Sequence, residues 1–347
     1  MAGQILIYGA YGYTGELIAR EAVKMGLTPR LGGRDATRLG PLAEDLGLEW
    51  VAFGVDDRAA TRAALDGIDT LLNGAGPFRE TYAALTEACL ATHTHYLDIT
   101  GEIDVLAGCA ALDERAKAAG ITIMPGTGFD VVPTDCMAAM LKERLPDATK
   151  LTLAFKGMAQ ASRGTAMSAI PHLGNPPYVR RDGDLVPRPG GVFSTLDMGE
   201  GPERVAAISW GDIVTAWHTT AIPNIEVFLV PPKDMVTLLK LPLFLRRFLA
   251  GAGRAIVNRV LARMPEGPDA TARSTGRCIV YGRAENAKGD AVQHVMTTAE
   301  GYYLTSLTAT RIAKAVSEGQ TAPGFLTPAR AFGSDYILGF EGSVLRN

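Results

Sequence analysis

Short apolar runs alternate with helix-like stretches along the first 130 residues of the chain. The apolar runs fall at residues 4–9, 28–33, 51–53, 69–73, 95–99 and 121–124. The alanine- and leucine-rich stretches between them include Glu16–Met25, Arg58–Leu65, Tyr82–Ala91 and Asp104–Ala119. Strands that alternate with helices of this length form βαβ units, and uniformly apolar strands are covered on both faces. The pattern predicts an α/β fold whose N-terminal Rossmann domain, a doubly wound parallel sheet, covers residues 1–130.

After Gly128 the pattern changes to longer β-like runs, at residues 150–156, 204–208, 225–231, 276–281 and 291–298. A helix is expected over Thr134–Arg144, and another is expected to follow Glu300 as far as about residue 316. Residues 174–191 are rich in Pro, Gly and Arg and are expected to form a loop. We predict a second, α+β substrate domain over residues 131–323 with a mixed or antiparallel sheet. The tail, residues 324–347, is expected to pack back onto the body.

The composition is that of a globular protein, with 47% hydrophobic and 20% charged residues in a chain of 347. The net charge is -3 and no basic tract stands out, so we expect no nucleic-acid partner. The four cysteines are scattered without a Cys-x-x-Cys pair, which favours a reducing compartment and argues against disulfides and a zinc site. No signal-peptide pattern precedes the first apolar run, and no stretch reaches the ~18 apolar residues of a membrane span. We therefore expect a cytoplasmic protein without a metal site.

One segment, Met235–Met264, combines leucine and phenylalanine clusters with the cations Lys240, Arg246, Arg247 and Arg254. The favoured interpretation is an amphipathic helix pair that faces the core and is interrupted at Pro242. The alternatives are a lid over an apolar substrate and a helix that lies on a membrane surface. A peripheral membrane contact through residues 235–264 therefore stays open.

A glycine-rich turn, Gly9-Ala10-Tyr11-Gly12-Tyr13-Thr14-Gly15, follows the first expected strand and opens a helix. In this context Gly9 allows the tight turn, Gly12 lets a pyrophosphate approach the backbone, and Gly15 lets the helix pack close to the strand. The helix N-terminus then presents free N–H groups and a partial positive charge to the phosphates. The turn predicts a dinucleotide cofactor.

The spacing Gly-x-x-Gly-x-x-Gly is typical of enzymes that prefer NADP, and the end of the second strand agrees with it. An NAD-specific site usually has an acidic residue there, which binds the ribose 2′-hydroxyl. This chain has Arg34, whose planar guanidinium suits a 2′-phosphate, and Arg38 could add a second charge one helical turn later. Asp35 is expected to cap the helix Ala36–Leu46. We predict NADPH as the cofactor.

Loops after the third and fourth strands complete the predicted cofactor site. Asp56 closes the third strand, where such folds contact the adenine, and small residues after the fourth strand let the backbone lie against the cofactor. The candidate cofactor-binding residues are Gly9, Tyr11, Gly12, Tyr13, Thr14, Gly15, Arg34, Asp56, Ala75, Gly76, Pro77 and Phe78.

Several blocks carry a resemblance to a known family: Gly9–Gly15, Gly32–Arg34, Asn73–Phe78, Tyr96–Glu102, Pro125–Asp130, Arg163–Thr165, Trp210–Asp212, Ile222–Glu226 and Gly324–Ala329. Together they resemble the saccharopine dehydrogenase-like NAD(P)-dependent oxidoreductases, above all the branch that includes the trans-acting enoyl reductases. The resemblance spans nearly the whole chain. It implies a Rossmann domain with an inserted or appended α/β domain and the use of NAD(P)H, but no single substrate. Thr127 stands where relatives often have cysteine, which weakens any role for a thiol.

Two features that the sequence lacks limit the range of reactions that the protein could catalyse. Short-chain dehydrogenases share the glycine spacing but need a Tyr-x-x-x-Lys pair, and none of the ten tyrosines has lysine four residues later. A substrate with several carboxylates would need several cations, and Arg163 stands alone in its motif. We therefore favour hydride transfer to an apolar, enoyl-type small molecule. The alternatives are an imine or amino-acid-type dehydrogenase and a non-catalytic, NADP-binding or membrane-associated protein. A homodimer is possible.

The candidate catalytic residues are Tyr96, Asp130 and His218. Three residues follow the fifth strand near the expected position of the nicotinamide, namely Tyr96, Asp98 and Glu102; the two carboxylates could instead cap the next helix. Asp130 lies at the domain junction, where it either faces the cleft or caps the helix that begins near residue 133. His218, on an expected strand, is the best-placed histidine for a proton donor in the second domain.

Overall fold

The computed structural model of the chain describes residues 3–157, 162–169, 174–189, 191–253, 257, 259–260, 263 and 266–346. The chain forms two compact units. The first contains residues 1–132 and 302–331, and the second contains residues 133–301 and 332–347. The first border lies two residues from the predicted border at residue 130. The later border differs from the prediction, since residues 302–331 return to the first unit instead of continuing the second.

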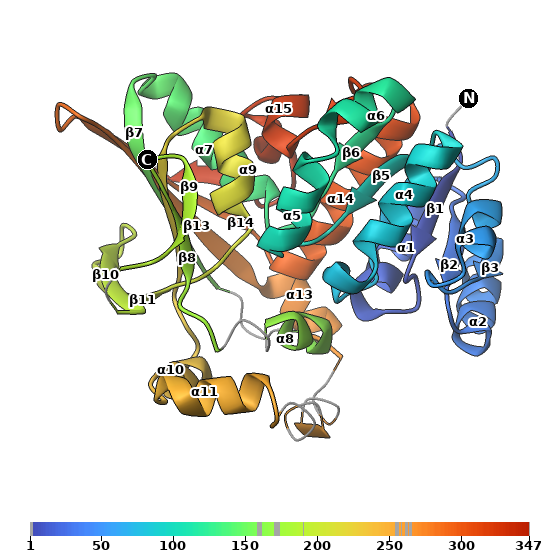
Figure 1. Ribbon diagram of the computed structural model, residues 1–347, viewed down its shortest axis with the longest axis horizontal. Helices are drawn as coiled ribbons and strands as arrows, with labels where there is room; N and C mark the ends of the chain where they lie inside the picture. Colours follow the sequence, from blue (N-terminus) through green and yellow to red (C-terminus); the bar gives the residue numbers. More distant parts are fainter. Residues whose placement is uncertain are drawn as a thin grey trace. The chain divides into compact units, whose positions relative to one another are not determined.

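The first unit is built on a seven-stranded sheet in the order β15-β6-β5-β4-β1-β2-β3 (Figure 1). Its strands are β1 (Ile5–Tyr8), β2 (Arg30–Gly33), β3 (Trp50–Ala52), β4 (Thr70–Asn73), β5 (His95–Asp98), β6 (Thr122–Met124) and β15 (Gly324–Phe325). All of these pairings are parallel. The predicted doubly wound parallel sheet is confirmed, and its order reverses between β1 and β4, where such folds bind their ligands.

Helices cover the two faces of this sheet. They are α1 (Tyr13–Lys24), α2 (Ala36–Leu46), α3 (Arg58–Ala64), α4 (Tyr82–Thr92), α5 (Ile103–Ala110), α6 (Asp113–Ala119) and α14 (Gly301–Ser317). Leu6 and Tyr8 of β1 pack in a core with residues of α4, α5 and α6, while Ile5 and Ile7 face α1 and α14. This alternation explains the apolar run, because both faces of β1 are buried.

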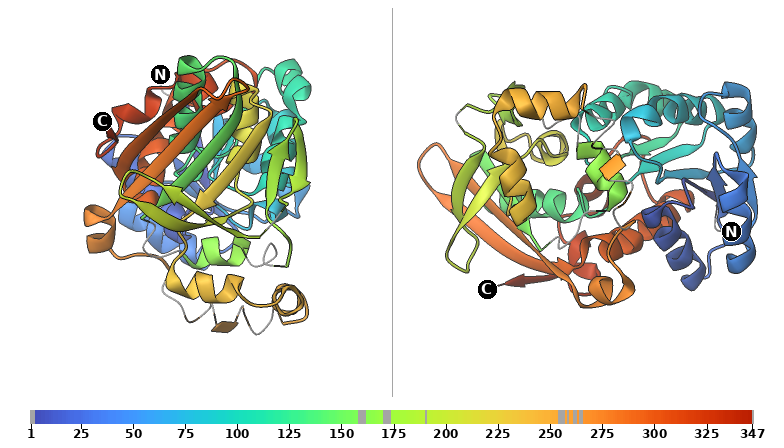
Figure 2. Two further views of the ribbon diagram at one scale, coloured as in Figure 1. Left: turned by 90° about the vertical axis from the view of Figure 1, so that its left-hand side faces the viewer. Right: turned by 90° about the horizontal axis from the view of Figure 1, so that it is seen from below.

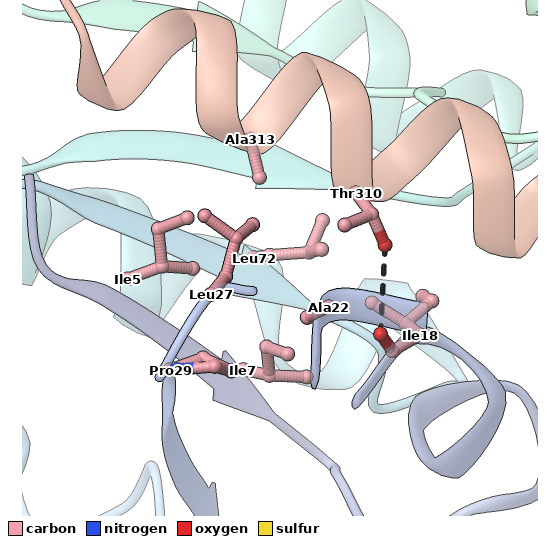
Figure 3. Close-up of a pocket in the computed structure, with 9 residues that line it drawn as sticks. All are labelled: Ile5, Ile7, Ile18, Ala22, Leu27, Pro29, Leu72, Thr310 and Ala313. Carbon is pink, nitrogen blue, oxygen red and sulfur yellow. Dashed lines mark hydrogen bonds between the residues drawn. The ribbon is translucent and has the colours of Figure 1, made fainter. Parts of the chain in front are cut away.

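Helix α14 belongs to the first unit because its apolar face completes one side of the parallel sheet. Figure 3 shows the place where Thr310 and Ala313 of α14 meet Ile18 of α1 across a small apolar gap. The Thr310 hydroxyl donates to the Ile18 carbonyl at 3.5 Å. The gap has a volume of about 10 Å³, far below the ~300–1,000 Å³ of ligand pockets. It is therefore a packing gap and not a substrate site.

The second unit contains a nine-stranded mixed sheet, as predicted. Its order is β10-β11-β12-β7-β13-β14-β16, with β8 paired to β12 and β9 paired to β8. The strands are β7 (Ala148–Lys156), β8 (Tyr178–Arg181), β9 (Asp184–Pro187), β10 (Phe193–Asp197), β11 (Pro202–Ala207), β12 (Asn224–Leu229), β13 (Arg277–Asn286), β14 (Ala291–Ala299) and β16 (Val344–Arg346). The pair β12–β7 is parallel and the other described pairs are antiparallel.

Helices of the second unit include α7 (Val132–Arg144), α8 (Arg163–Ala169), α9 (Asp212–Thr220), α10 (Lys233–Leu239), α11 (Leu243–Ala250) and α13 (Ala270–Thr275). Three short helices lie elsewhere along the chain. They are η1 (Phe78–Glu80) in the first unit, α15 (Pro328–Phe332) where the chain passes from the first unit to the second, and η3 (Tyr336–Gly339) in the second unit. The predicted helix over 134–144 is therefore present. None of the helices in the described ranges is both long and apolar enough to cross a membrane.

Three expectations for the second domain are wrong. Residues 174–191 are not only a loop, because β8 and β9 form a hairpin whose turn, Asp182-Gly183, has positive φ at both positions (48° and 90°). This is the geometry that two-residue hairpins prefer. His218 lies on helix α9 and not on a strand. No residue of α11 is buried, so the predicted helix pair does not face the core along that helix. Arg254 and Met264, the far end of that segment, lie outside the described residues.

Candidate cofactor and active site

The ends of three parallel strands lie at one level of the first unit's sheet. Tyr8 of β1 is in register with Asn73 of β4, and Asn73 is in register with Asp98 of β5. The loops that follow these residues therefore begin side by side at the carboxyl edge. Open α/β sheets bind ligands outside this edge, at the point where the strand order reverses. The loops after β1 and β4 flank that point here.

Gly9 holds the loop after β1 against its neighbours on both sides. Its φ is +78°, and a Cβ atom there would lie 2.8 Å from the Ala75 nitrogen in the loop after β4. The Gly9 N–H donates to the Gly32 carbonyl of β2 at 2.8 Å. A side chain at this position would therefore meet backbone as well as being strained. The predicted role of Gly9 in a tight turn agrees with this geometry.

Gly15 lets helix α1 approach the strand that precedes it. A Cβ atom on Gly15 would lie 2.2 Å from the Gly9 carbonyl oxygen, a backbone atom that cannot move aside. Gly12, the residue before the first turn of α1, has extended backbone angles and makes no side-chain cap. The first N–H groups of a helix have no partner within the helix. The turn therefore forms a cradle that places the first N–H groups of α1 where the sequence predicts the pyrophosphate.

Two arginines stand beside this cradle. Arg34, at the end of β2, is exposed and makes no ion pair among the described residues. Arg38 is held over the Tyr11 ring, with its guanidinium carbon 4.6 Å from the ring centroid, and donates to the Tyr11 carbonyl at 3.0 Å. Asp35 caps α2 through the Thr37 N–H, as predicted, so its carboxylate is engaged at 3.0 Å. Arg34 is therefore an exposed cation at the end of β2, the position at which the sequence predicts a contact with the ribose 2′-phosphate.

The remaining cofactor candidates lie on the same edge. Tyr13 and Thr14 are half-buried on the first turn of α1, and the Tyr13 ring packs edge-on against Tyr302 of α14. Asp56 is exposed after β3, while its neighbour Asp57 caps α3 through the N–H groups of the first turn. Residues 74–78 follow β4, opposite Gly9. The structure thus brings the predicted residues to one edge of one sheet.

A network of buried hydrogen bonds connects the loops after β4, β5 and β6. The Asn73 side-chain oxygen accepts from the Ala75 N–H at 3.0 Å, and its amide donates to the Tyr96 hydroxyl at 3.3 Å. Tyr96 in turn donates to Asp98 at 2.8 Å. The Asp98 carboxylate also accepts the N–H groups of Thr100 and Gly126, both at 2.9 Å. One buried chain of hydrogen bonds therefore ties together the loops after β4, β5 and β6.

Glu102 fastens the loop after β4 from the other side. Its carboxylate accepts from the N–H groups of Phe78 at 2.9 Å and Arg79 at 3.2 Å. The expected alternative, in which Asp98 and Glu102 cap the next helix, is wrong, because α5 has no side-chain cap at Glu102. Nothing in the sequence pattern marked Glu102 for this role, since the two donors lie more than twenty residues away.

Two of the predicted catalytic residues, Tyr96 and Asp130, differ in their exposure to solvent. Tyr96 is fully buried, and burial raises the pKa of its hydroxyl well above the usual value. Asp130, after β6, is half-buried beside Gly101, on which an added Cβ atom would lie 3.0 Å from the Asp130 carboxylate. Desolvation raises the pKa of Asp130 to about 7, and that of fully buried Asp98 to about 6. Asp130 is thus a carboxyl group whose raised pKa places its titration close to neutral pH.

Other reactive side chains are placed elsewhere. His218 is exposed on α9 of the second unit. All four cysteines are buried, and burial raises the pKa of each thiol, which disfavours a nucleophilic role. Across the described ranges, no group of three or more His, Cys, Asp or Glu side chains is placed to hold a metal ion.

Part of the first unit is similar in sequence to known proteins. Residues 5–124 match the family model of the saccharopine dehydrogenase NADP binding domain. A trans-acting enoyl reductase of Mycobacterium leprae is 33% identical over 153 residues, which are 41% of this chain and 36% of that protein. An Arabidopsis thaliana protein named as a probable mitochondrial saccharopine dehydrogenase-like oxidoreductase is 31% identical over 153 residues, 38% of this chain and 33% of that protein. The matches thus span about a third of the curated relatives' length.

The fold of the whole chain also has a solved counterpart. The apo saccharopine dehydrogenase (L-Glu forming) of Saccharomyces cerevisiae superposes with a TM-score of 0.63 at 12% identity, covering 96% of both chains. At this identity the likeness concerns the fold alone. The family model and the geometry of the turn agree on NADP(H) binding by the first unit, as the sequence predicted.

The substitution Gly15→Ala tests the close approach of α1 to the turn. Because the new methyl group meets a backbone oxygen, α1 has to shift, which we expect to cost about 1–3 kcal/mol of stability and at least about tenfold in NADPH affinity. Chemical denaturation and a fluorescence titration with NADPH measure the two effects. Gly54→Ala is the control, because a Cβ atom there meets nothing within 4 Å. Equal behaviour of the two variants would contradict this account.

The substitution Asp98→Asn tests the buried carboxyl group. Since burial raises the pKa of Asp98 from 3.8 to about 6, the folded protein binds this proton more tightly than the unfolded chain does. Its charge therefore lowers stability as the pH rises from about 4 to about 6. Relative to the wild type, the variant should gain about 3 kcal/mol in unfolding free energy across that window. Denaturation curves between pH 4 and 7 measure the difference, and a difference independent of pH would refute the shift.

Proposed function

We propose that this chain, whose residues 5–124 match the saccharopine dehydrogenase NADP binding domain, is an NADPH-dependent oxidoreductase that reduces an apolar, enoyl-type substrate. The observation that carries the proposal is the glycine cradle at the N-terminus of α1 with Arg34 beside it. Backbone N–H groups there bind the pyrophosphate, and the guanidinium of Arg34 binds the 2′-phosphate. When bound, NADPH supplies the hydride.

Asp130 is the residue that we assign to the proton. Reduction of a carbon–carbon double bond adds a hydride to one carbon and a proton to the other, so the protein needs a group that is protonated near neutral pH. The raised pKa of Asp130, about 7, and its place after β6 at the carboxyl edge meet this need. Tyr96, fully buried, acts as a positioning residue through Asp98. His218 remains the candidate proton donor among the residues of the second unit.

The substrate class rests on the names of the relatives and on the reactions that the residues of this chain disfavour. The relatives of about 30% identity include several named trans-acting enoyl reductase. Buried thiols of raised pKa argue against a covalent cysteine intermediate. The missing Tyr-x-x-x-Lys pair argues against ketone reduction of the short-chain dehydrogenase type. Together these points favour an unsaturated thioester with an apolar chain over a substrate with several carboxylates.

The substitution Arg34→Ala tests the preference for NADPH. Loss of one charge-assisted contact to a phosphate should weaken NADPH binding about 10- to 100-fold and leave NADH binding within about twofold. Arg30→Ala, at the other end of the same strand, is the matched control, because its partner is Glu49. Calorimetric titration with both nucleotides gives the result. Tighter binding of NADH than of NADPH by the wild type would overturn the assignment of Arg34.

The reaction is tested by mixing the protein and NADPH, without oxygen, with enoyl thioesters of increasing chain length. We expect oxidation of NADPH, read from its absorbance, that rises with chain length, and a loss of about 100-fold or more in Asp130→Asn. Unchanged NADPH binding in this variant would separate the proton step from cofactor binding. No oxidation across the whole panel, with NADPH bound, would contradict the enoyl assignment while leaving the cofactor assignment intact.

A further inference from the structure

Helix α11 exposes large apolar side chains to solvent. Phe244 is 70% exposed and Phe248, one turn later on the same face, is 52% exposed. Leu243 and Leu245 are each 38% exposed, and no residue of the helix is buried. An exposed cluster of this kind on a globular protein usually marks a place where something binds. We call Leu243, Phe244, Leu245 and Phe248 the α11 surface.

The segment around the α11 surface carries positive charge only. From Met235 to Pro265 the sequence contains six cations and no acidic residue, although the whole chain has a net charge of -3. The cations are Lys240, Arg246, Arg247, Arg254, Arg259 and Arg263. Of those the structure describes, Lys240, Arg247, Arg259 and Arg263 are exposed. Apolar side chains flanked by an excess of cations match a surface that is apolar inside and anionic outside.

The arrangement of α10 and α11 leaves this surface accessible within its unit. In Figure 1 and in the left view of Figure 2 both helices lie beyond one end of the strands of the nine-stranded sheet. Arg247 of α11 donates to the Gly174 carbonyl at 3.2 Å, a contact that holds the helix to the segment before β8. Eight residues of helix span about 12 Å, far less than the ~30 Å of a bilayer core. The helix can therefore lie on a membrane but not cross it.

We propose that the α11 surface binds the face of an anionic phospholipid bilayer, with the phenylalanines at the acyl boundary and the cations among the headgroups. Amphipathic helices that lie in the interface have this combination of aromatic, leucine and basic residues. Charge disfavours a second copy of the chain as the occupant, since two such surfaces would bring like charges together. The proposal goes beyond the proposed function and does not depend on it.

Vesicle co-sedimentation of the full chain tests this proposal. We expect binding to vesicles with 30% phosphatidylglycerol that is at least about tenfold stronger than binding to pure phosphatidylcholine, and that falls as salt is raised. The double variant Phe244→Ser/Phe248→Ser should lose most of this binding. The triple variant Lys240→Gln/Arg259→Gln/Arg263→Gln should lose the dependence on anionic lipid.

Val344→Ser is the matched control, because Val344 is 61% exposed on β16, away from α11 in sequence, and its loss should not change vesicle binding. Unaltered NADPH binding and thermal unfolding in all variants would keep this result separate from the proposed function. Failure of the wild type to bind anionic vesicles would overturn the proposal. So would equal binding to neutral vesicles, or self-association of the wild type that the double phenylalanine variant abolishes.

Discussion

The close approach of helix α1 to the turn that precedes it is the constraint on which the first unit depends. At Gly15 the helix passes so near to the Gly9 carbonyl that a methyl group would lie 2.2 Å from the oxygen. This contact fixes where the first turn of α1 begins, and so where its unpaired N–H groups lie. The anion cradle, the neighbouring loop after β4 and the cation at the end of β2 are all placed with respect to that helix end.

Buried hydrogen bonds hold the other loops of the carboxyl edge in place. Asn73, Tyr96 and Asp98 connect the loops after β4, β5 and β6, while Glu102 fastens the Phe78 N–H. Such a network is costly to break, because each buried group would lose a partner that water cannot replace. The loops that would contact a cofactor are therefore rigid parts of the sheet's edge, which suits a site that must position a dinucleotide.

More of the structure of the N-terminal unit than of the second unit could be predicted from the sequence alone. Uniformly apolar strands and the glycine spacing are local signals, so the strands β1–β6, the cap at Asp35 and the position of Arg34 followed from them. Two features depended on distant partners. Helix α14 joins the first unit because the face of β1 with Ile5 and Ile7 needs a cover, and Glu102 binds backbone donors on another loop. No local pattern reveals either.

The remaining differences between the predictions and the structure concern local features for which the sequence does contain a signal. Asp182-Gly183 is a strong hairpin signal inside a stretch that looked like a loop. The cluster of leucine and phenylalanine around α11 has helical spacing, which is equally compatible with a buried or an exposed face until packing is known. Periodicity therefore predicted the helix but could not predict what covers it.

The most direct test of the central claim is a crystal structure of the chain with NADP⁺. The account predicts that the pyrophosphate oxygens accept hydrogen bonds from the backbone N–H groups at the first turn of α1, and that the 2′-phosphate contacts the Arg34 guanidinium. A dinucleotide bound away from residues 9–15, or a 2′-phosphate turned away from Arg34, would contradict it.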